Sequence, residues 1–145
     1  MIEPPLLMLA EGRRPRLRRA PVLPPDKESK LHVQVASTLF DHALPDWRWS
    51  HFPAGEKRNK ITGARLKRMG LRRGWPDFQL ISPAGVYHGL ELKRLGEPLT
   101  DDQEDFQLWC IQRGVPHAVA YTLDQAHVAL DAWGCLRIKF GGRPL

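Results

Sequence analysis

Two short apolar segments separated by a tight turn dominate the middle of the chain. Residues 77–82 and 86–93 carry apolar side chains at loosely alternating positions, which is the pattern of half-buried strands. Pro83-Ala84-Gly85 lies between them and suits a three-residue loop, because proline fixes φ and glycine supplies a left-handed position. The pattern therefore predicts a β-hairpin.

Further helices and strands are predicted on both sides of this hairpin. The helices are expected over residues 26–44, 62–69, 100–113 and 124–133, and the strands over residues 47–51 and 115–121. The third helix should bury Phe106, Trp109 and Cys110 and connect the hairpin to the last strand as a crossover. That strand is mostly apolar, so we expect burial on both faces. The predicted fold class is α/β, with a small mixed sheet flanked by helices.

Composition indicates one basic globular domain. The chain has 145 residues, of which 42% are hydrophobic and 26% charged, enough for one core and too few for two. Residues 1–25 are rich in proline and arginine and are expected to form a disordered basic arm, which leaves residues 26–145 as the domain. A net charge of +6 favours nucleic acid or another anionic surface as the partner.

Neither export nor membrane insertion is indicated. No apolar run approaches the length of a transmembrane helix, and the apolar stretch at residues 6–10 precedes the basic cluster, unlike a signal peptide. Cys110 and Cys135 lie in apolar segments, and neither has a second cysteine at metal-ligand spacing. We expect buried thiols, a reducing compartment and a cytoplasmic location.

The register of the hairpin decides whether two acidic side chains meet. With a three-residue loop Asp77 lies opposite Glu91, and Lys93 projects from the same face. A four-residue loop would pair Asp77 with Leu90 and separate the two acids. Adjacent carboxylates repel each other unless a cation lies between them, and Mg²⁺ suits such a site. The alternative is solvated charges without a catalytic role, against which the apolar neighbours of Glu91 weigh.

Cations and aromatic residues are interleaved along residues 47–73. This composition predicts a surface for the phosphate backbone of a nucleic acid, although core burial is favoured for Trp47 and Trp49 over base stacking or a subunit interface. The residues expected to contact the backbone are His51, Arg58, Lys60, Arg65, Lys67, Arg72 and Arg73.

Three phrases of the sequence, taken in order, resemble the virus-type replication-repair nuclease (VRR-NUC) domain of the PD-(D/E)xK nuclease superfamily. They are KRMGLRRGWPDF at residues 67–78, HGLELKR at residues 88–94 and LTDDQEDFQLW at residues 99–109. The stretch HFPAGEKR at residues 51–58 is similar to the family's His-x-Pro-Asn-Gly-x-x-Arg, with Ala54 where asparagine is usual. The resemblance spans roughly residues 28–134 and is to the stand-alone bacterial or phage form.

This resemblance implies a restriction-endonuclease-like core and a Mg²⁺-dependent DNA endonuclease in which Mn²⁺ substitutes. It also implies a homodimer that prefers branched DNA such as Holliday junctions. The metal ligands would be Asp77, Glu91, Glu28 and the main-chain carbonyl of Leu92, and the catalytic residues would be Asp77, Glu91, Lys93 and Gln103.

Two rival functions are a non-catalytic DNA-binding module on a nuclease fold and a general or restriction-type nuclease. The intact set of Asp77, Glu91 and Lys93 weighs against the first rival. The second usually needs additional recognition elements, for which this short chain has little room.

Overall fold

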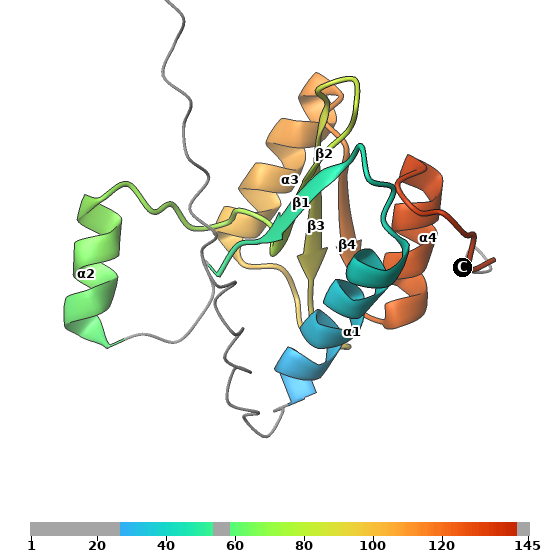
Figure 1. Cartoon of the computed structure of the whole chain (residues 1–145). Coiled ribbons are helices and arrows are strands. Elements are labelled where there is room, and N and C mark those ends of the chain that lie inside the picture. The colour runs from blue at the N-terminus through green and yellow to red at the C-terminus, as the bar shows by residue number, and fades with distance from the viewer. Residues whose placement is uncertain (1–26, 54–58, 142–145) are drawn as a thin grey trace, which may run out of the picture.

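The order of helices and strands is the predicted one. The computed structural model describes residues 27–53 and 59–141, with side chains from residue 30 onward. Within these residues the elements follow the order α1-β1-α2-β2-β3-α3-β4-α4 (Figure 1). The helices are α1 (Lys27–His42), α2 (Lys60–Arg68), α3 (Asp101–Arg113) and α4 (Leu123–Trp133), and the strands are β1 (Arg48–His51), β2 (Phe78–Ile81), β3 (Tyr87–Leu92) and β4 (His117–Ala120).

In the described part of the chain the strands form one mixed sheet in the order β1-β2-β3-β4. The pairs β1–β2 and β2–β3 are antiparallel, whereas β4 runs parallel to β3 because α3 provides the crossover between them. The predicted α/β class, with a small mixed sheet flanked by helices, is confirmed.

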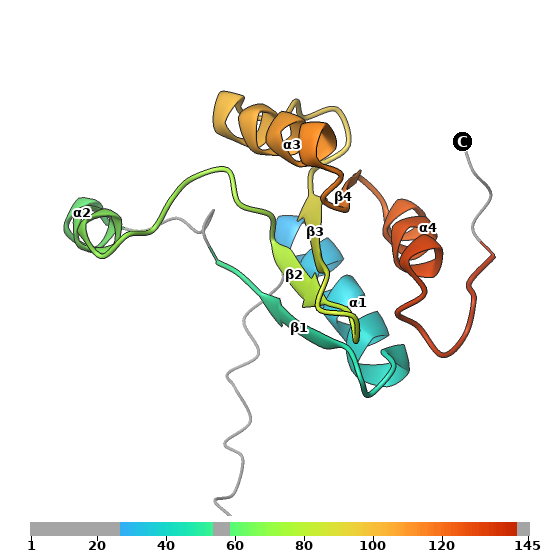
Figure 2. The same cartoon turned by 90° about the horizontal axis from the view of Figure 1, so that it is seen from above.

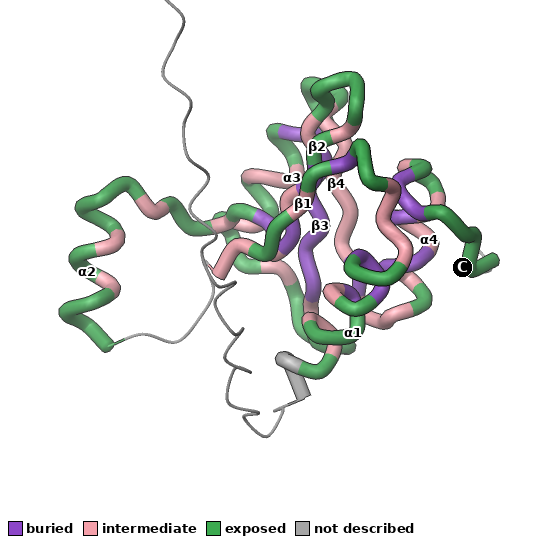
Figure 3. Tube along the Cα trace, in the orientation of Figure 1, coloured by how far each residue is buried: buried purple, intermediate pink, exposed green. Residues whose placement is uncertain are grey.

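Helices cover both faces of this sheet. α1 and α4 lie on one face and α3 lies on the other, as the view from above shows (Figure 2). The main core fills the space between the sheet and the α1–α4 pair, where Leu39, Leu80, Leu90 and Leu130 are almost completely buried (Figure 3). Residues at even positions of β3 therefore face this core, and those at odd positions face α3.

α2 stands away from the sheet, as both cartoon views show (Figures 1 and 2), and it buries none of its residues. Its N-cap is Asn59, whose side-chain oxygen accepts a hydrogen bond of 2.7 Å from the Thr62 N–H. Since α2 does not contribute to the core, packing does not account for its sequence.

Two burial predictions are wrong. Trp109 is 49% exposed on α3 and lies under the guanidinium of Arg113, 4.3 Å from the ring centre, while Cys110 is the residue that α3 buries. Of β4, only Ala120 is buried, because β4 is the edge strand and solvent reaches its outer flank. By contrast, Trp47 is buried in the core as predicted, and Cys110 and Cys135 are free buried thiols.

Some of the predictions concern residues that the structure does not describe. The basic arm at residues 1–25 lies there, and so do Ala54 and Arg58 of the predicted backbone-binding loop. None of the helices in the described residues is long and apolar enough to cross a membrane.

Candidate active site

The β2–β3 hairpin brings the two predicted acids side by side. A main-chain hydrogen bond of 2.9 Å closes the three-residue loop, and Phe78 pairs with Leu90 at the other end of the hairpin. The next pair in this register is Asp77 and Glu91. The shorter of the two predicted loops is therefore confirmed, and with it the convergence of the acids.

Asp77 is held from three elements. Its Oδ2 accepts a hydrogen bond of 2.8 Å from the Leu92 N–H, and its Oδ1 lies 3.9 Å from His32 Nε2 on α1. The His51 ring nitrogen Nδ1 lies 3.0 Å from the main-chain oxygen of Asp77. Burial raises the pKa of the Asp77 carboxyl, and the Leu92 N–H and the two histidines oppose this rise.

Glu91 is the more deeply buried acid, with 4% of its surface exposed. Gln103 Nε2 on α3 donates a hydrogen bond of 2.6 Å to Glu91 Oε1, and Gln103 Oε1 accepts one of 2.9 Å from the Thr100 N–H. The predicted capping box of α3 is thus confirmed, and it orients the side chain that holds Glu91.

The charges around Glu91 explain its altered acidity. Burial, followed by the negative charge of Asp77, raises the pKa of Glu91 to about 8, while the positive charge of Lys93 opposes the rise. A hydrogen bond between the two carboxyl groups adds to the effect. The pair therefore favours keeping one proton when no cation is present.

A glycine lets α3 approach the acid pair closely. Gly74 has a φ of +88°, and a Cβ at this position would lie 2.4 Å from the main-chain oxygen of Asp102. The first turn of α3 thus packs directly on the backbone that leads into β2. This close approach sets Gln103 at hydrogen-bonding distance from Glu91.

Lys93 follows β3 directly and is half-buried. Its N–H donates a hydrogen bond of 3.0 Å to the Ala120 main-chain oxygen, which extends the pairing of β3 with β4. Strand alternation places Lys93 on the same side as Glu91. The two acids and one amine predicted from the sequence thus lie at one end of the sheet.

The donor set partly fits a divalent metal ion. In the part of the chain that the structure describes, no group of three or more His, Cys, Asp and Glu residues is placed to hold one. Asp77 and Glu91 supply two carboxylates, and Glu28 is the second residue of α1, but its side chain lies outside the described residues. Two adjacent carboxylates, of which Asp77 raises the pKa of Glu91, suit Mg²⁺, since a cation replaces the proton on Glu91 and relieves the repulsion. The ligand role of the Leu92 carbonyl stays a prediction.

His32 is a site residue that sequence reasoning missed. Its ring lies edge-on to His51 at 5.2 Å between centres and near the Asp77 carboxylate. It follows Glu28 by four residues on the predicted helix, a spacing that places two residues on one helix face. This spacing was the feature of the sequence that could have pointed to His32 as a site residue.

The predicted backbone-binding cations in the described residues lie on α2 and in the segment that follows it. No acidic residue occurs between residues 59 and 76. The exposed cations of this segment, here called the α2 surface, are Lys60, Arg65, Lys67, Arg68, Arg72 and Arg73. His51 is also exposed but lies beside Asp77, nearer to the acid pair.

The chain matches no protein-family model, and no curated protein or solved structure is significantly similar to it. Its functional interpretation therefore depends on the residues of the site.

We expect Glu91→Gln to stabilise the metal-free protein at alkaline pH. The pKa of Glu91 is raised from 4.5 to about 8, so stability falls as the pH rises through this interval. Glutamine keeps the shape and removes the charge, which should add about 2 kcal/mol at pH 8.5 and little at pH 4.5. Thermal unfolding in EDTA at both pH values measures this difference.

The matched control is Glu97→Gln, at an exposed position in the loop after β3. It should leave the difference between the two pH values unchanged. A Glu91→Gln protein less stable than the unmodified chain at pH 8.5 would contradict the burial of a destabilising charge.

Proposed function

We propose that this chain is a metal-dependent DNA endonuclease of the VRR-NUC type that hydrolyses phosphodiester bonds of intracellular DNA. The observation that carries the proposal is the adjacent Asp77–Glu91 pair, in which Glu91 is buried and accepts a hydrogen bond from Gln103, with Lys93 directly after the strand that carries Glu91. Placing two carboxylates together in a partly buried site costs folding free energy, so such pairs are typical of functional sites. The cationic α2 surface in the same chain suits a polyanionic substrate.

Each residue has a distinct role in the proposed reaction. Asp77 and Glu91, joined by Glu28 and the Leu92 carbonyl, would hold Mg²⁺ or Mn²⁺, which when bound acidifies a water and neutralises charge on the phosphate. The Leu92 N–H and Gln103 fix the two carboxylates before substrate binds, so little reorganisation is needed. Lys93 stabilises the negative charge that develops on the phosphoryl oxygens.

The α2 surface would position the DNA backbone without reading its sequence. Contacts from lysine and arginine to phosphates fix the register of a protein on DNA but carry no base information. His51 was also predicted to contact the DNA backbone, but its ring contacts the main chain of Asp77. We therefore assign His51 to orienting Asp77 in addition to the predicted backbone contact.

Branched DNA and a homodimer belong to the same proposal. A four-way junction is resolved by two symmetric nicks, and a two-fold dimer supplies two active sites related in the same way. This part rests on the resemblance to the stand-alone VRR-NUC proteins. Light scattering at the concentration of the cleavage assay tests the dimer.

One observation favours the rival of a non-catalytic DNA-binding module. Among the described side chains only two carboxylates converge, fewer than a metal ion with purely protein ligands needs. The rival predicts DNA binding without cleavage in any metal. The nuclease proposal requires that Glu28 or water complete the coordination.

Cleavage by the full chain separates these functions. We expect labelled four-way junctions to be cut in Mg²⁺ or Mn²⁺ and to stay intact in EDTA, with flap and linear duplexes of the same sequence cut more slowly. Hydrolysis that persists in EDTA after metal stripping would refute the metal site. Binding without cleavage in both metals would favour the non-catalytic module, and equal rates on all substrates would indicate a general nuclease.

A further inference from the structure

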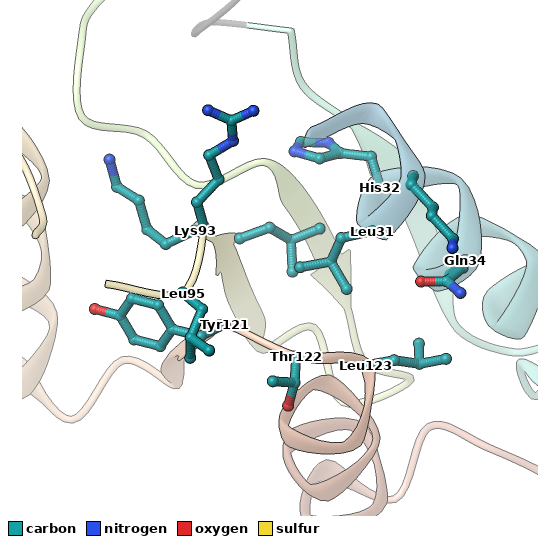
Figure 4. Close-up of a pocket in the computed structure, with 11 residues that line it drawn as sticks. Leu31, His32, Gln34, Lys93, Leu95, Tyr121, Thr122 and Leu123 are labelled. Atoms are coloured by element: carbon teal, nitrogen blue, oxygen red, sulfur yellow. The ribbon is translucent and has the colours of Figure 1, made fainter. Parts of the chain in front are cut away.

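A pocket of about 460 Å³ opens beside the acid pair, between α1, the end of β3 and the start of α4. Figure 4 shows Leu31 and His32 of α1 on one side and Leu95 and Tyr121 on the other. The cavity is within the size range of small-ligand sites. It is therefore large enough for one nucleotide.

The pocket borders one proposed catalytic residue, Lys93, and two of its other lining residues contact Asp77. His32 lines it and also lies 3.9 Å from the Asp77 carboxylate. Leu92 lines it and donates its N–H to the other oxygen of the same carboxylate at 2.8 Å. Lys93 is also part of its wall. A phosphate at the acid pair would consequently have its neighbouring nucleoside at the mouth of the pocket.

The lining combines an apolar wall with cations. Leucine side chains and the Tyr121 ring supply the apolar surface, and Leu95, at the rim, is 79% exposed. Lys30, Lys93 and Arg94 supply positive charge, and none of the described residues that line the pocket is acidic. Aromatic and apolar surfaces bind the faces of bases, and adjacent cations bind phosphates.

We propose that this pocket takes one unpaired nucleotide of the DNA strand, next to the phosphate that is cut. A base within a duplex is stacked and paired, so it enters such a pocket only by leaving the helix. The inference rests on the proposed nuclease function and adds to it that one nucleotide beside the scissile bond leaves the helix, which costs least where pairing is already interrupted, as at a branch point. Tyr121 stacks on the base, and Lys30 and Arg94 bind its flanking phosphate.

Binding in Ca²⁺ tests the pocket separately from cleavage, because the looser coordination of Ca²⁺ supports binding more than hydrolysis. Fluorescence anisotropy compares a forked duplex that carries unpaired thymidines with a blunt duplex of the same paired sequence. We expect about tenfold tighter binding of the fork, the factor that one stacked base contributes. A 2-aminopurine at the first unpaired position should lose fluorescence on binding.

Four variants locate this preference. Tyr121→Ala and Leu95→Glu should reduce the fork-to-blunt ratio of affinities to near one, since one removes the ring and the other places an acid at the rim. Tyr121→Phe keeps the ring and should keep the ratio. Trp109→Ala, at an exposed aromatic residue on α3 outside the pocket, is the control and should also keep it.

Each outcome decides a separate point. Equal affinity of the unmodified protein for fork and blunt duplex overturns the pocket proposal, and so does a full preference in both Tyr121→Ala and Leu95→Glu. Displacement of 2-aminopurine by micromolar dTMP, with no fork preference, would assign the pocket to free nucleotides instead. Fork preference without cleavage in Mg²⁺ would refute the nuclease and leave the pocket, whereas no DNA affinity would refute both.

Discussion

Asp77→Asn and Glu91→Gln are each expected to lower the rate of DNA cleavage about a thousandfold or more, with the fold and DNA affinity retained. Both substitutions keep the shape of the side chain and its hydrogen-bond acceptor, so the contacts with Leu92 and Gln103 can persist. What they remove is the negative charge that would hold the metal ion, and with it the stabilisation of the transition state. Single-turnover cleavage of a labelled junction in saturating protein measures the effect.

Lys93→Met should lower the same rate about a hundredfold or more. Removing one preorganised hydrogen-bond donor from a charge that develops in the transition state lowers the rates of enzymes by about this factor. The control is Asp105→Asn, which removes an exposed acid on α3 and should cut at the unmodified rate. If Asp77→Asn or Glu91→Gln cleaves at near the unmodified rate, the acid pair is not the metal site. The unfolding temperature of the Glu91→Gln protein at the pH of the assay, expected to be at least as high as that of the unmodified chain, tests unfolding as a reason for lost activity.

The acid pair followed from local chemistry, so the sequence reduced the question to a choice between two loop lengths. The length of the Pro83-Ala84-Gly85 loop sets the register of the hairpin, and the register sets the partner of Asp77. The capping box of α3 could likewise be predicted from the sequence, because Thr100 and Gln103 contact each other within one helical turn. Features that depend on neighbours in sequence were therefore predicted well.

Features that depend on packing between distant elements were predicted less well. His32 reaches Asp77 because of how α1 packs on the sheet, and its four-residue spacing from Glu28 places the two on one helix face without showing that this face meets Asp77. Trp109 was expected inside because it is large and apolar, yet α3 turns Cys110, the next residue, toward the sheet. The resemblance named Gln103 as a catalytic residue without a partner, and the structure shows its direct hydrogen bond to Glu91.

The α2 surface is the basis of the second large effect. Replacing Arg65, Lys67, Arg72 and Arg73 together by glutamine should weaken DNA binding on the order of a hundredfold near physiological salt. Each lost phosphate contact removes about 0.9 from the slope of log K against log salt, so four contacts would reduce the slope by about 3.6. Glutamine has nearly the helix propensity of arginine and lysine, so α2 should persist.

A control variant that loses the same charge elsewhere distinguishes direct phosphate contacts of the α2 surface from attraction by the net charge of the protein. Four exposed cations outside the α2 surface, Arg48, Arg113, Arg137 and Lys139, are replaced by glutamine to give the same change in net charge. If the α2 surface contacts the phosphates, this control should lose far less affinity, and its slope of log K against log salt should stay near that of the unmodified chain. The reason is that salt at physiological ionic strength screens charges more than about 8 Å away. Equal slopes for the two quadruple variants, from titrations between 50 and 200 mM salt, would mean that α2 attracts DNA only through net charge. Because α2 buries nothing against the sheet, thermal unfolding of its quadruple variant should match that of the unmodified chain, which assigns any lost affinity to the DNA interface.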